Sequence, residues 1–370
     1  MTASSPLSRF IGAGGAALLL TLGSAPVAVA QEAQEVERER PELPPLTAQI
    51  PPEEALAAIK RRAQKILKAR RAARRLKVTA ELSEVVGYET NPATAATVRK
   101  GNSFIETDAY TMLSKKLTPT LDWQASYYGV YLQYEAYQDG DYTSHTLTPA
   151  KLSWRPGRMW RIESWLDYDY NYYHNAIDSS YRQLKTSSRI RQNLFGTVFH
   201  QVQYEFFERD YLHRNARTGA SAETLSNRVD RRHRLRYKTG LTVKEKLPLK
   251  NALFTVENDV YRNDSNDASS DYYDYDVWKI TSAVNGSATQ KLSLSGSFAF
   301  ERKNYRERPI TGYAAPARYD DKYTLNSTAT YQLNKTWRSA TALNFDHLAS
   351  NESTGEYDNM KYSLTLTASF

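Results

Sequence analysis

Hydrophobic and polar residues alternate with a period of two along most of the chain after Leu76. The clearest run closes the chain, where Tyr362, Leu364, Leu366, Ala368 and Phe370 alternate with serine and threonine. Residues 160–172 and 292–300 follow the same rule. A period of two predicts β-strands with one apolar and one polar face, of which only the apolar face is removed from water.

The alternation predicts fourteen strands, many of them longer than 13 residues. Strands of soluble proteins usually have about 5–6 residues, whereas tilted membrane strands need about 9–11 for the bilayer alone. The predicted ranges are 77–89, 103–117, 119–136, 142–155, 159–173, 180–195, 197–211, 225–243, 251–262, 271–286, 290–304, 321–333, 336–349 and 357–370. The alternative is a soluble sandwich, in which the apolar faces would form a core.

The connections between these strands alternate in length. Short ones fall at 118–119, 155–158, 195–196, 244–250, 288–290 and 334–335, and longer polar ones include 90–102, 212–224 and 305–320. An even strand number with short periplasmic turns and long outer loops is typical of bacterial barrels. We therefore expect an all-β fold, a 14-stranded antiparallel up-and-down transmembrane β-barrel over residues 77–370, in the outer membrane of a Gram-negative cell envelope.

Tryptophan supports the membrane interpretation. Four tryptophans that are far apart in the sequence, Trp123, Trp154, Trp160 and Trp337, lie near predicted short turns. An aromatic belt at the membrane interface predicts this grouping.

The N-terminal region has three predicted parts before the barrel. Residues 1–30 are typical of a signal peptide, with Arg9, an apolar run and Ala28-Val29-Ala30 as the cleavage site. A transmembrane anchor is the alternative. Residues 31–52 form a Pro-rich acidic linker, and residues 53–76 predict a short basic amphipathic helix in the periplasm, with Leu56, Ile59, Ala63 and Ile66 on one face.

The basic character of the chain comes from that helix. The whole chain is +8, and residues 53–77 carry ten bases against two acids, which is also +8. Since the signal is +1 and the linker −3, residues 78–370 are only +2. We therefore expect no nucleic-acid partner. The charged face of the helix could simply be solvated, the helix could contact anionic headgroups or a periplasmic partner, or it could plug the barrel.

Composition leaves little room for catalysis or metal binding. The chain has no cysteine, and its six histidines are scattered. We expect no metal, no cofactor, no catalytic residues and no enzymatic activity. The carboxylates between Asp264 and Asp276 are interpreted as a solvated outer loop, because they match no calcium-binding loop. A hydrolase using His145 and Asp169 remains a third, weaker hypothesis.

The polar positions of the predicted strands should line the lumen. A basic arc on strands six to eight is flanked by acids on strands five and nine, which could set up a transverse field or form neutralising pairs. The opposite wall, on strands eleven to fourteen, carries small side chains. The expected pore-lining residues are Arg161, Glu163, Asp167, Asp169, Lys185, Arg189, Arg191, Glu205, Arg209, Arg232, Arg234, Arg236, Lys238, Glu257 and Asp259.

Two local patterns resemble known outer-membrane proteins. The final alternating strand, Tyr362, Leu364, Leu366, Ala368 and Phe370, is similar to the C-terminal signal that the barrel assembly machinery recognises. Gly87-Tyr88-Glu89-Thr90-Asn91-Pro92 resembles the opening of the type 2 family of β-barrel porins, with Glu89 and Thr90 departing from the usual Asp-Ser. That resemblance implies a porin-like barrel linked to exopolysaccharide secretion.

These patterns lead to one main functional hypothesis. We expect a porin-like channel for passive transport of small hydrophilic, anionic or saccharide solutes. The alternative is a component of a polysaccharide or protein export or assembly system, with the basic helix as gate or partner-binding element. Outer-membrane lipid and lipopolysaccharide are the expected surroundings, and the oligomeric state is left open.

Overall fold

The computed structural model describes residues 57, 60–64, 76–94, 100–218, 222–243, 249–268, 273–310 and 317–370. The chain divides into two units, Met1–Ala72 and Ala73–Phe370. In the first unit, residues 57 and 60–64 are helical and fall inside the predicted helix 53–76. The predicted signal 1–30 and linker 31–52 lie outside the described residues. Among the described residues, none of the helices has both the length and the apolar character needed to cross a membrane.

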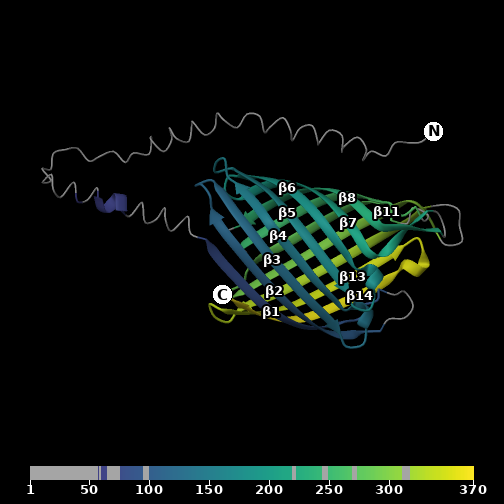
Figure 1. The fold of residues 1–370 in the computed structure, drawn as a ribbon. Helices are drawn as coiled ribbons and strands as arrows, with labels where there is room; N and C mark the ends of the chain where they lie inside the picture. The colour runs from purple at the N-terminus through teal and green to yellow at the C-terminus, as the bar shows by residue number, and fades with distance from the viewer. Residues whose placement is uncertain are drawn as a thin grey trace, which may run out of the picture. The chain divides into compact units, whose positions relative to one another are not determined.

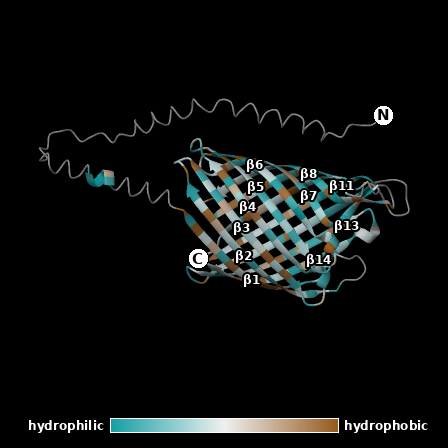
Figure 2. Ribbon diagram, in the orientation of Figure 1, coloured by the Kyte–Doolittle hydropathy of each residue, from teal (hydrophilic) through white to brown (hydrophobic). Residues whose placement is uncertain are grey.

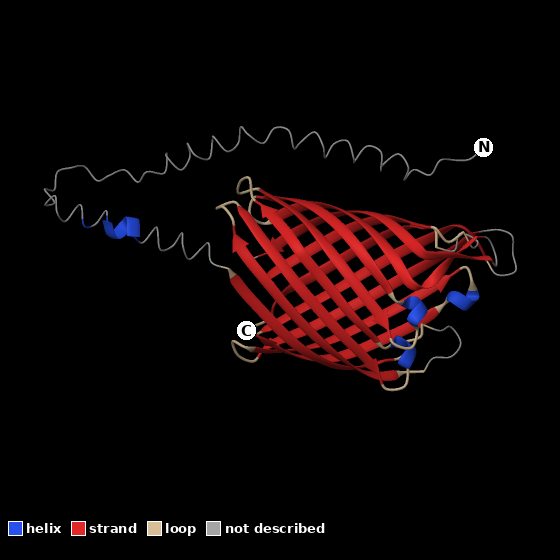
Figure 3. Cartoon of the chain, in the orientation of Figure 1, coloured by secondary structure: helices blue, strands red, loops and turns tan. Residues whose placement is uncertain are grey.

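The second unit is a closed barrel of fourteen antiparallel strands, as predicted (Figures 1 and 3). Each strand pairs with its sequence neighbours, and β1 closes the ring with β14. The strands are β1 Lys77–Glu89, β2 Asn102–Lys116, β3 Leu121–Tyr134, β4 Tyr142–Trp154, β5 Trp160–Tyr173, β6 Tyr181–Leu194, β7 Val198–Thr218, β8 Ala222–Val243, β9 Lys250–Ser265, β10 Tyr275–Ser287, β11 Leu292–Pro309, β12 Ala317–Gln332, β13 Trp337–Ser350 and β14 Tyr357–Ser369.

The two ends of the barrel differ, and we call them the short-turn end and the long-loop end. The long-loop end carries three short 3₁₀ helices, η2 Gln138–Gly140, η3 Ile177–Ser179 and η4 Ser353–Gly355. The prediction of a loop over 212–224 is wrong, because β7 and β8 continue as a hairpin in which Asn215 pairs with Asn227 and Arg217 with Glu223. The sequence did not indicate this extension, because a strand segment outside the membrane needs no apolar face and its polar side chains do not alternate with apolar ones.

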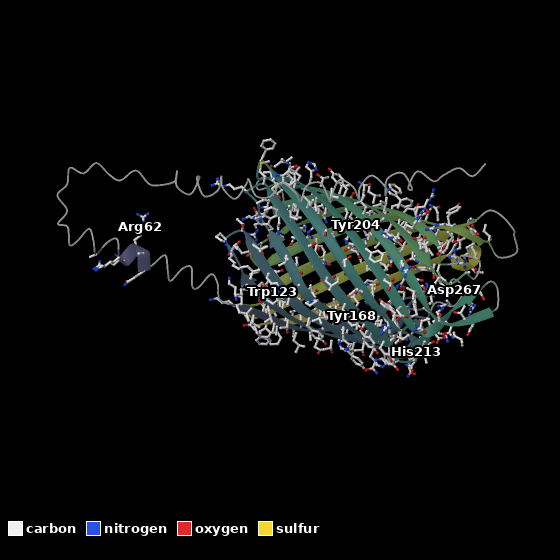
Figure 4. All side chains as sticks on the ribbon, turned by 45° about the horizontal axis from the view of Figure 1, so that its top comes forward. Arg62, Trp123, Tyr168, Tyr204, His213 and Asp267 are labelled. Carbon is white, nitrogen blue, oxygen red and sulfur yellow. The ribbon has the colours of Figure 1, made fainter. Side chains whose placement is uncertain are left out.

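Hydrophobic and hydrophilic residues alternate along the strands (Figure 2), and the outward positions are apolar over the length that a bilayer requires. On β11 the outward positions run from Leu292 to Phe300, which is nine residues, and Arg302 ends the run. On β7 the same length separates Val198 from Phe206. Tilted strands need about 9–11 residues to cross the hydrocarbon. Leu364, Phe298 and Tyr168 are 51%, 48% and 42% exposed, so these apolar side chains are not hidden in a core; Tyr168 is labelled in Figure 4.

Ion pairs on the outer face mark where this apolar band ends toward the long loops. Exposed ion pairs are not stable in hydrocarbon. The parts of the strands between these pairs and the long loops therefore project beyond the membrane. We call these pairs the outer girdle: Arg182–Asp210, Glu208–Arg231, Arg262–Asp276 and Arg302–Asp321. At the other end, Trp123, Trp160 and Trp337 occupy outward positions beside short turns.

The Gly87–Pro92 segment ties the closing strands together. Glu89 accepts hydrogen bonds from Tyr134 Oη (2.7 Å) and from the Asn359 side-chain amide. The Asn91 backbone N–H donates to Asn359 Oδ1 at 2.9 Å. Gly87 lies under the Phe104 ring, where a Cβ would come within 2.3 Å of the ring. This part of the motif therefore serves the β1–β14 closure.

Candidate functional site

The register places all fifteen predicted pore-lining residues on the inner face of β5–β9. Arg161, Glu163 and Asp167 alternate with the outward Ile162 and Leu166. The same alternation holds across the neighbouring strands, where inward Arg189 pairs with Gln203 and outward Ile190 with Val202. The structure also shows which of these side chains meet.

Glu163 is the point where three bases converge. Its carboxylate accepts from Arg161 Nη2 at 3.0 Å and from Arg189 Nε at 2.7 Å, and Lys151 Nζ lies 3.2 Å away. The Glu163 side chain is only 2% exposed, whereas its three partners are 26–38% exposed. One buried carboxylate thus holds three partly solvated cations, which leaves this node with a local charge of +2.

Four of the other acids of this wall bind bases of an adjacent strand, and the fifth, Asp169, accepts a hydrogen bond from a glutamine. Asp167 binds Lys185 at 2.8 Å and accepts from Thr148 and Trp165. Glu205 binds Arg236 at 2.5 Å and lies 3.6 Å from Arg234. Further along the ring, Arg234 Nε donates to Asp259 at 2.9 Å, Lys238 lies 3.3 Å from Glu257, and Gln183 donates to Asp169 at 2.8 Å. Much of the wall is therefore a cross-strand network of ion pairs, which stiffens it.

Three bases of the arc differ, because they have no carboxylate partner. Among the described residues, no carboxylate oxygen lies within 4.0 Å of Arg191, Arg209 or Arg232. Aromatic rings hold them instead: Arg191 lies 3.7 Å from the Phe199 ring centroid and Arg209 lies 4.0 Å from that of Tyr181. On β6–β8 the predicted bases number eight and face a single predicted acid, Glu205. This arc keeps an excess of positive charge.

Arg191 shows how three strands build one such position. Gly240 on β8 has no side chain, and the Phe199 ring of β7 fills that space, where a Cβ would come within 2.2 Å of it. Arg191 of β6 places its guanidinium over the Phe199 ring, and its Nε donates to Asn193 Oδ1 at 3.0 Å. A cation over a ring gains electrostatic stabilisation without neutralising its charge.

The opposite wall carries small side chains, as the alternation indicated. Ser293 and Ser295 on β11 are exposed, and Thr328 and Ala342 face each other across β12 and β13. A hollow of about 210 Å³ opens there, lined in part by Ser293, Ser295 and Thr330. A second hollow of about 240 Å³ lies on the inner face of β2–β6, beside Lys151, Trp165 and Arg189. Space for solvent is thus present on both walls.

Sequence reasoning missed several inward residues. Lys151 was overlooked because Pro149 lies in a register shift of β4, between Leu147 and Ala150, after which the inward positions change from even to odd numbers. Proline has no N–H for the ladder, which is the one signal that could have located the shift. Trp165, Phe199 and Lys303 were also missed, and the aromatic residues among them hold the arginines of the arc.

The residues of the hydrolase hypothesis lie on opposite sides of the wall. His145 is on the outer face, where its Nδ1 lies 2.8 Å from Tyr127 Oη. Asp169 is on the inner face beside Gln183. Among the other described histidines, His200 and His233 also bond to outward tyrosines. Figure 4 labels one of these tyrosines, Tyr204. His213 lies beyond the outer girdle in the β7–β8 hairpin (Figure 4).

The residues predicted as the assembly signal lie on β14 and directly after it. Tyr362, Leu364 and Leu366 are exposed on the outer face, and Ala368 is buried. Phe370 is 76% exposed, and its backbone N–H bonds to Ala80 O at 2.8 Å. The terminal aromatic ring is therefore accessible at the short-turn end.

No family model and no curated protein matches this sequence. Solved structures with a similar chain path include OmpT of Vibrio cholerae with loop L8 deleted, an outer-membrane protein, with a TM-score of 0.47, 9% identity, and coverage of 80% of this chain and 100% of that one. A bacterial polysaccharide outer-membrane secretin has a TM-score of 0.43 and 10% identity, covering 79% and 98%. Pseudomonas aeruginosa OccK2 in complex with glucuronate has a TM-score of 0.38 and 9% identity, covering 80% and 98%.

Proposed function

We propose that this chain is an outer-membrane channel through which small hydrophilic solutes diffuse, with a preference for anions. The observation that carries the proposal is the inner wall of β6–β8, where the eight predicted bases outnumber the single predicted acid and no described carboxylate lies within 4.0 Å of Arg191, Arg209 or Arg232. An excess of one sign of charge on the wall raises the local concentration of counter-ions in a narrow aqueous path. The small side chains of β11–β14 leave volume beside it.

Barrel geometry is compatible with a channel. Eight strands give an interior that side chains fill, and sixteen to eighteen leave an aqueous channel. Fourteen strands fall between these cases, so the distribution of side chains in the interior determines whether an aqueous channel remains. Here the long charged side chains of β5–β9 are drawn to the wall by their cross-strand ion pairs, which favours free space on the side of β11–β14.

The outer membrane is the proposed location, because the apolar band of the barrel fits a bilayer and the strand connections differ at the two ends. In this arrangement the short-turn end faces the periplasm and the long-loop end faces the exterior. The final strand would be the segment that barrel assembly machinery recognises, with Phe370 exposed for that contact. Lipid and lipopolysaccharide would surround the outer face.

The basic helix is unsuited to lie against the basic arc. Residues 53–77 carry a charge of +8, and like charges confined at low dielectric repel. We therefore propose that the helix acts outside the lumen, through anionic headgroups or a periplasmic partner. An export or assembly role remains the second candidate function, and the ten bases of this segment are what favours it.

Conductance and solute flux test both functions. The full mature chain and a variant lacking residues 31–76 would be reconstituted in planar bilayers and in vesicles that report uptake of organic anions and neutral sugars. The channel proposal expects ion current and faster anion uptake from both proteins. Absence of current from both would overturn it. Current only after the deletion, or loss of a co-purifying partner upon deletion, would favour the gate or partner role instead.

A further inference from the structure

The long-loop end of the inner wall holds two cations that share one aromatic ring. Arg232 of β8 donates from Nη2 to Tyr275 Oη at 2.6 Å, and its Cζ lies 5.8 Å from the centroid of that ring. Lys303 of β11 places Nζ 3.9 Å from the same centroid. The two positive groups are therefore less than about 10 Å apart, although two strands, β9 and β10, separate β8 from β11 in the ring.

Neither cation is neutralised by the part of the protein that the structure describes. The remaining partners of Arg232 are Asn263 Oδ1 at 3.4 Å and the rings of Phe207 and Tyr261, each 4.6 Å away. Lys303 is flanked by Tyr305, at 4.5 Å, and has no carboxylate oxygen within 4.0 Å among the described residues.

The carboxylate opposite Lys303 is already used. Asp320 pairs with Lys303 in the strand register, but its oxygens accept from Arg318 Nε at 2.8 Å, from Tyr305 Oη at 3.2 Å and from Ser350 Oγ at 2.7 Å. Arg318, like most bases of the barrel, therefore has its own acid. Arg232 and Lys303 lie near each other, and neither has a carboxylate partner among the described residues. This is a local exception to the ion pairing along the wall.

The rings around these cations point to the rest of a ligand. Tyr261, Tyr275 and Tyr305 form edge-on pairs, with centroids 6.3 and 5.9 Å apart, and so make a continuous aromatic surface on β9–β11. The Tyr261 hydroxyl makes no hydrogen bond to any described residue. An aromatic face packs against the C–H face of a sugar ring, and a free hydroxyl can pair with a sugar hydroxyl.

We propose that Arg232 and Lys303, with the tyrosine surface formed by Tyr261, Tyr275 and Tyr305, bind the carboxylate and ring of a cyclic sugar acid at the long-loop mouth of the barrel. This rests on the proposed channel function and names the solute class that its wall would select. The guanidinium and the ammonium group would share the carboxylate, which supplies the missing counter-charge. The ring would lie on the tyrosines.

The chain offers matched controls at the next residues. Arg231 directly precedes Arg232, and Arg302 directly precedes Lys303. Both controls point outward and are paired in the outer girdle, Arg231 with Glu208 and Arg302 with Asp321. Arg231→Gln and Arg302→Gln thus remove the same unit of charge from the same strands without touching the inner face.

Galacturonate binding to the detergent-refolded barrel would be measured by calorimetry, and galacturonate block of the reconstituted channel by current recording. We expect binding of galacturonate over glucose, a drop in affinity of about 10- to 100-fold in Arg232→Gln and in Lys303→Gln, and less than about twofold in the controls. Arg232→Lys should recover part of the affinity. Circular dichroism checks that each variant folds.

Equal affinity in wild type and both inner variants would overturn the proposal, as would equal losses in the outward controls. If glucose bound as tightly as galacturonate, the rings and not the cations would determine binding, and the proposal would also be overturned. A barrel that carries no current but binds galacturonate through Arg232 and Lys303 would remove the channel function and leave the site.

Discussion

Replacing Glu163 by glutamine should destabilise the barrel more than any other single neutralisation on this wall. The substitution keeps the shape and leaves Lys151, Arg161 and Arg189 without a counter-charge. Removing one partner of a fully buried pair costs about 3–5 kcal/mol. Because the three bases are 26–38% exposed to the lumen, water recovers part of that cost, and we expect a loss of about 2–3 kcal/mol in the free energy of unfolding.

The measurement is urea unfolding of the barrel refolded into vesicles, followed by tryptophan fluorescence. Glu257→Gln is the matched control, since Lys238, at 3.3 Å, is the single base within 4.0 Å of Glu257 among the described residues, and both side chains are partly exposed. It should cost less than about 1 kcal/mol. If both variants lost the same free energy, the convergence of three bases on Glu163 would contribute nothing beyond an ordinary pair, and the reasoning would be refuted.

Two other substitutions test separate parts of the structure. Glu84 lies exposed at a lipid-facing position of β1, and Glu84→Leu should raise the free energy of unfolding in vesicles by about 1–3 kcal/mol; a loss would show that a partner needs the acid. Gly240→Ala should cost about 1–3 kcal/mol because its methyl group meets Phe199, whereas Gly157→Ala, which faces open space, should leave the urea midpoint nearly unchanged.

The strand number and the facing of most residues could be predicted because alternation reports directly on lipid and water. Leu292 to Phe300 and Tyr362 to Phe370 show this rule without any knowledge of their partners. The rule failed where lipid is absent. Beyond the outer girdle, the β7–β8 hairpin continues to Thr218 with polar residues on both faces, and the sequence resembles a loop there.

The pairing of charges could not be predicted, because it depends on register. Arg189 and Arg191 both point inward, and a shift of two residues would bring Arg191 instead of Arg189 opposite Glu163. The same holds for Arg232 and Lys303, which meet over Tyr275 although they come from different parts of the sequence. Alternation shows which side chains point inward, and only the strand register shows which of them meet.

The zero-current potential of the reconstituted barrel in a KCl gradient tests the central proposal most directly. With the excess positive charge of β6–β8 facing an aqueous lumen, we expect a potential of the sign that marks chloride as the more permeant ion. Its magnitude should fall when Arg191, Arg209 and Arg232 are replaced together by glutamine. A potential of the opposite sign, or one that the triple substitution leaves unchanged, would contradict an anion-preferring channel.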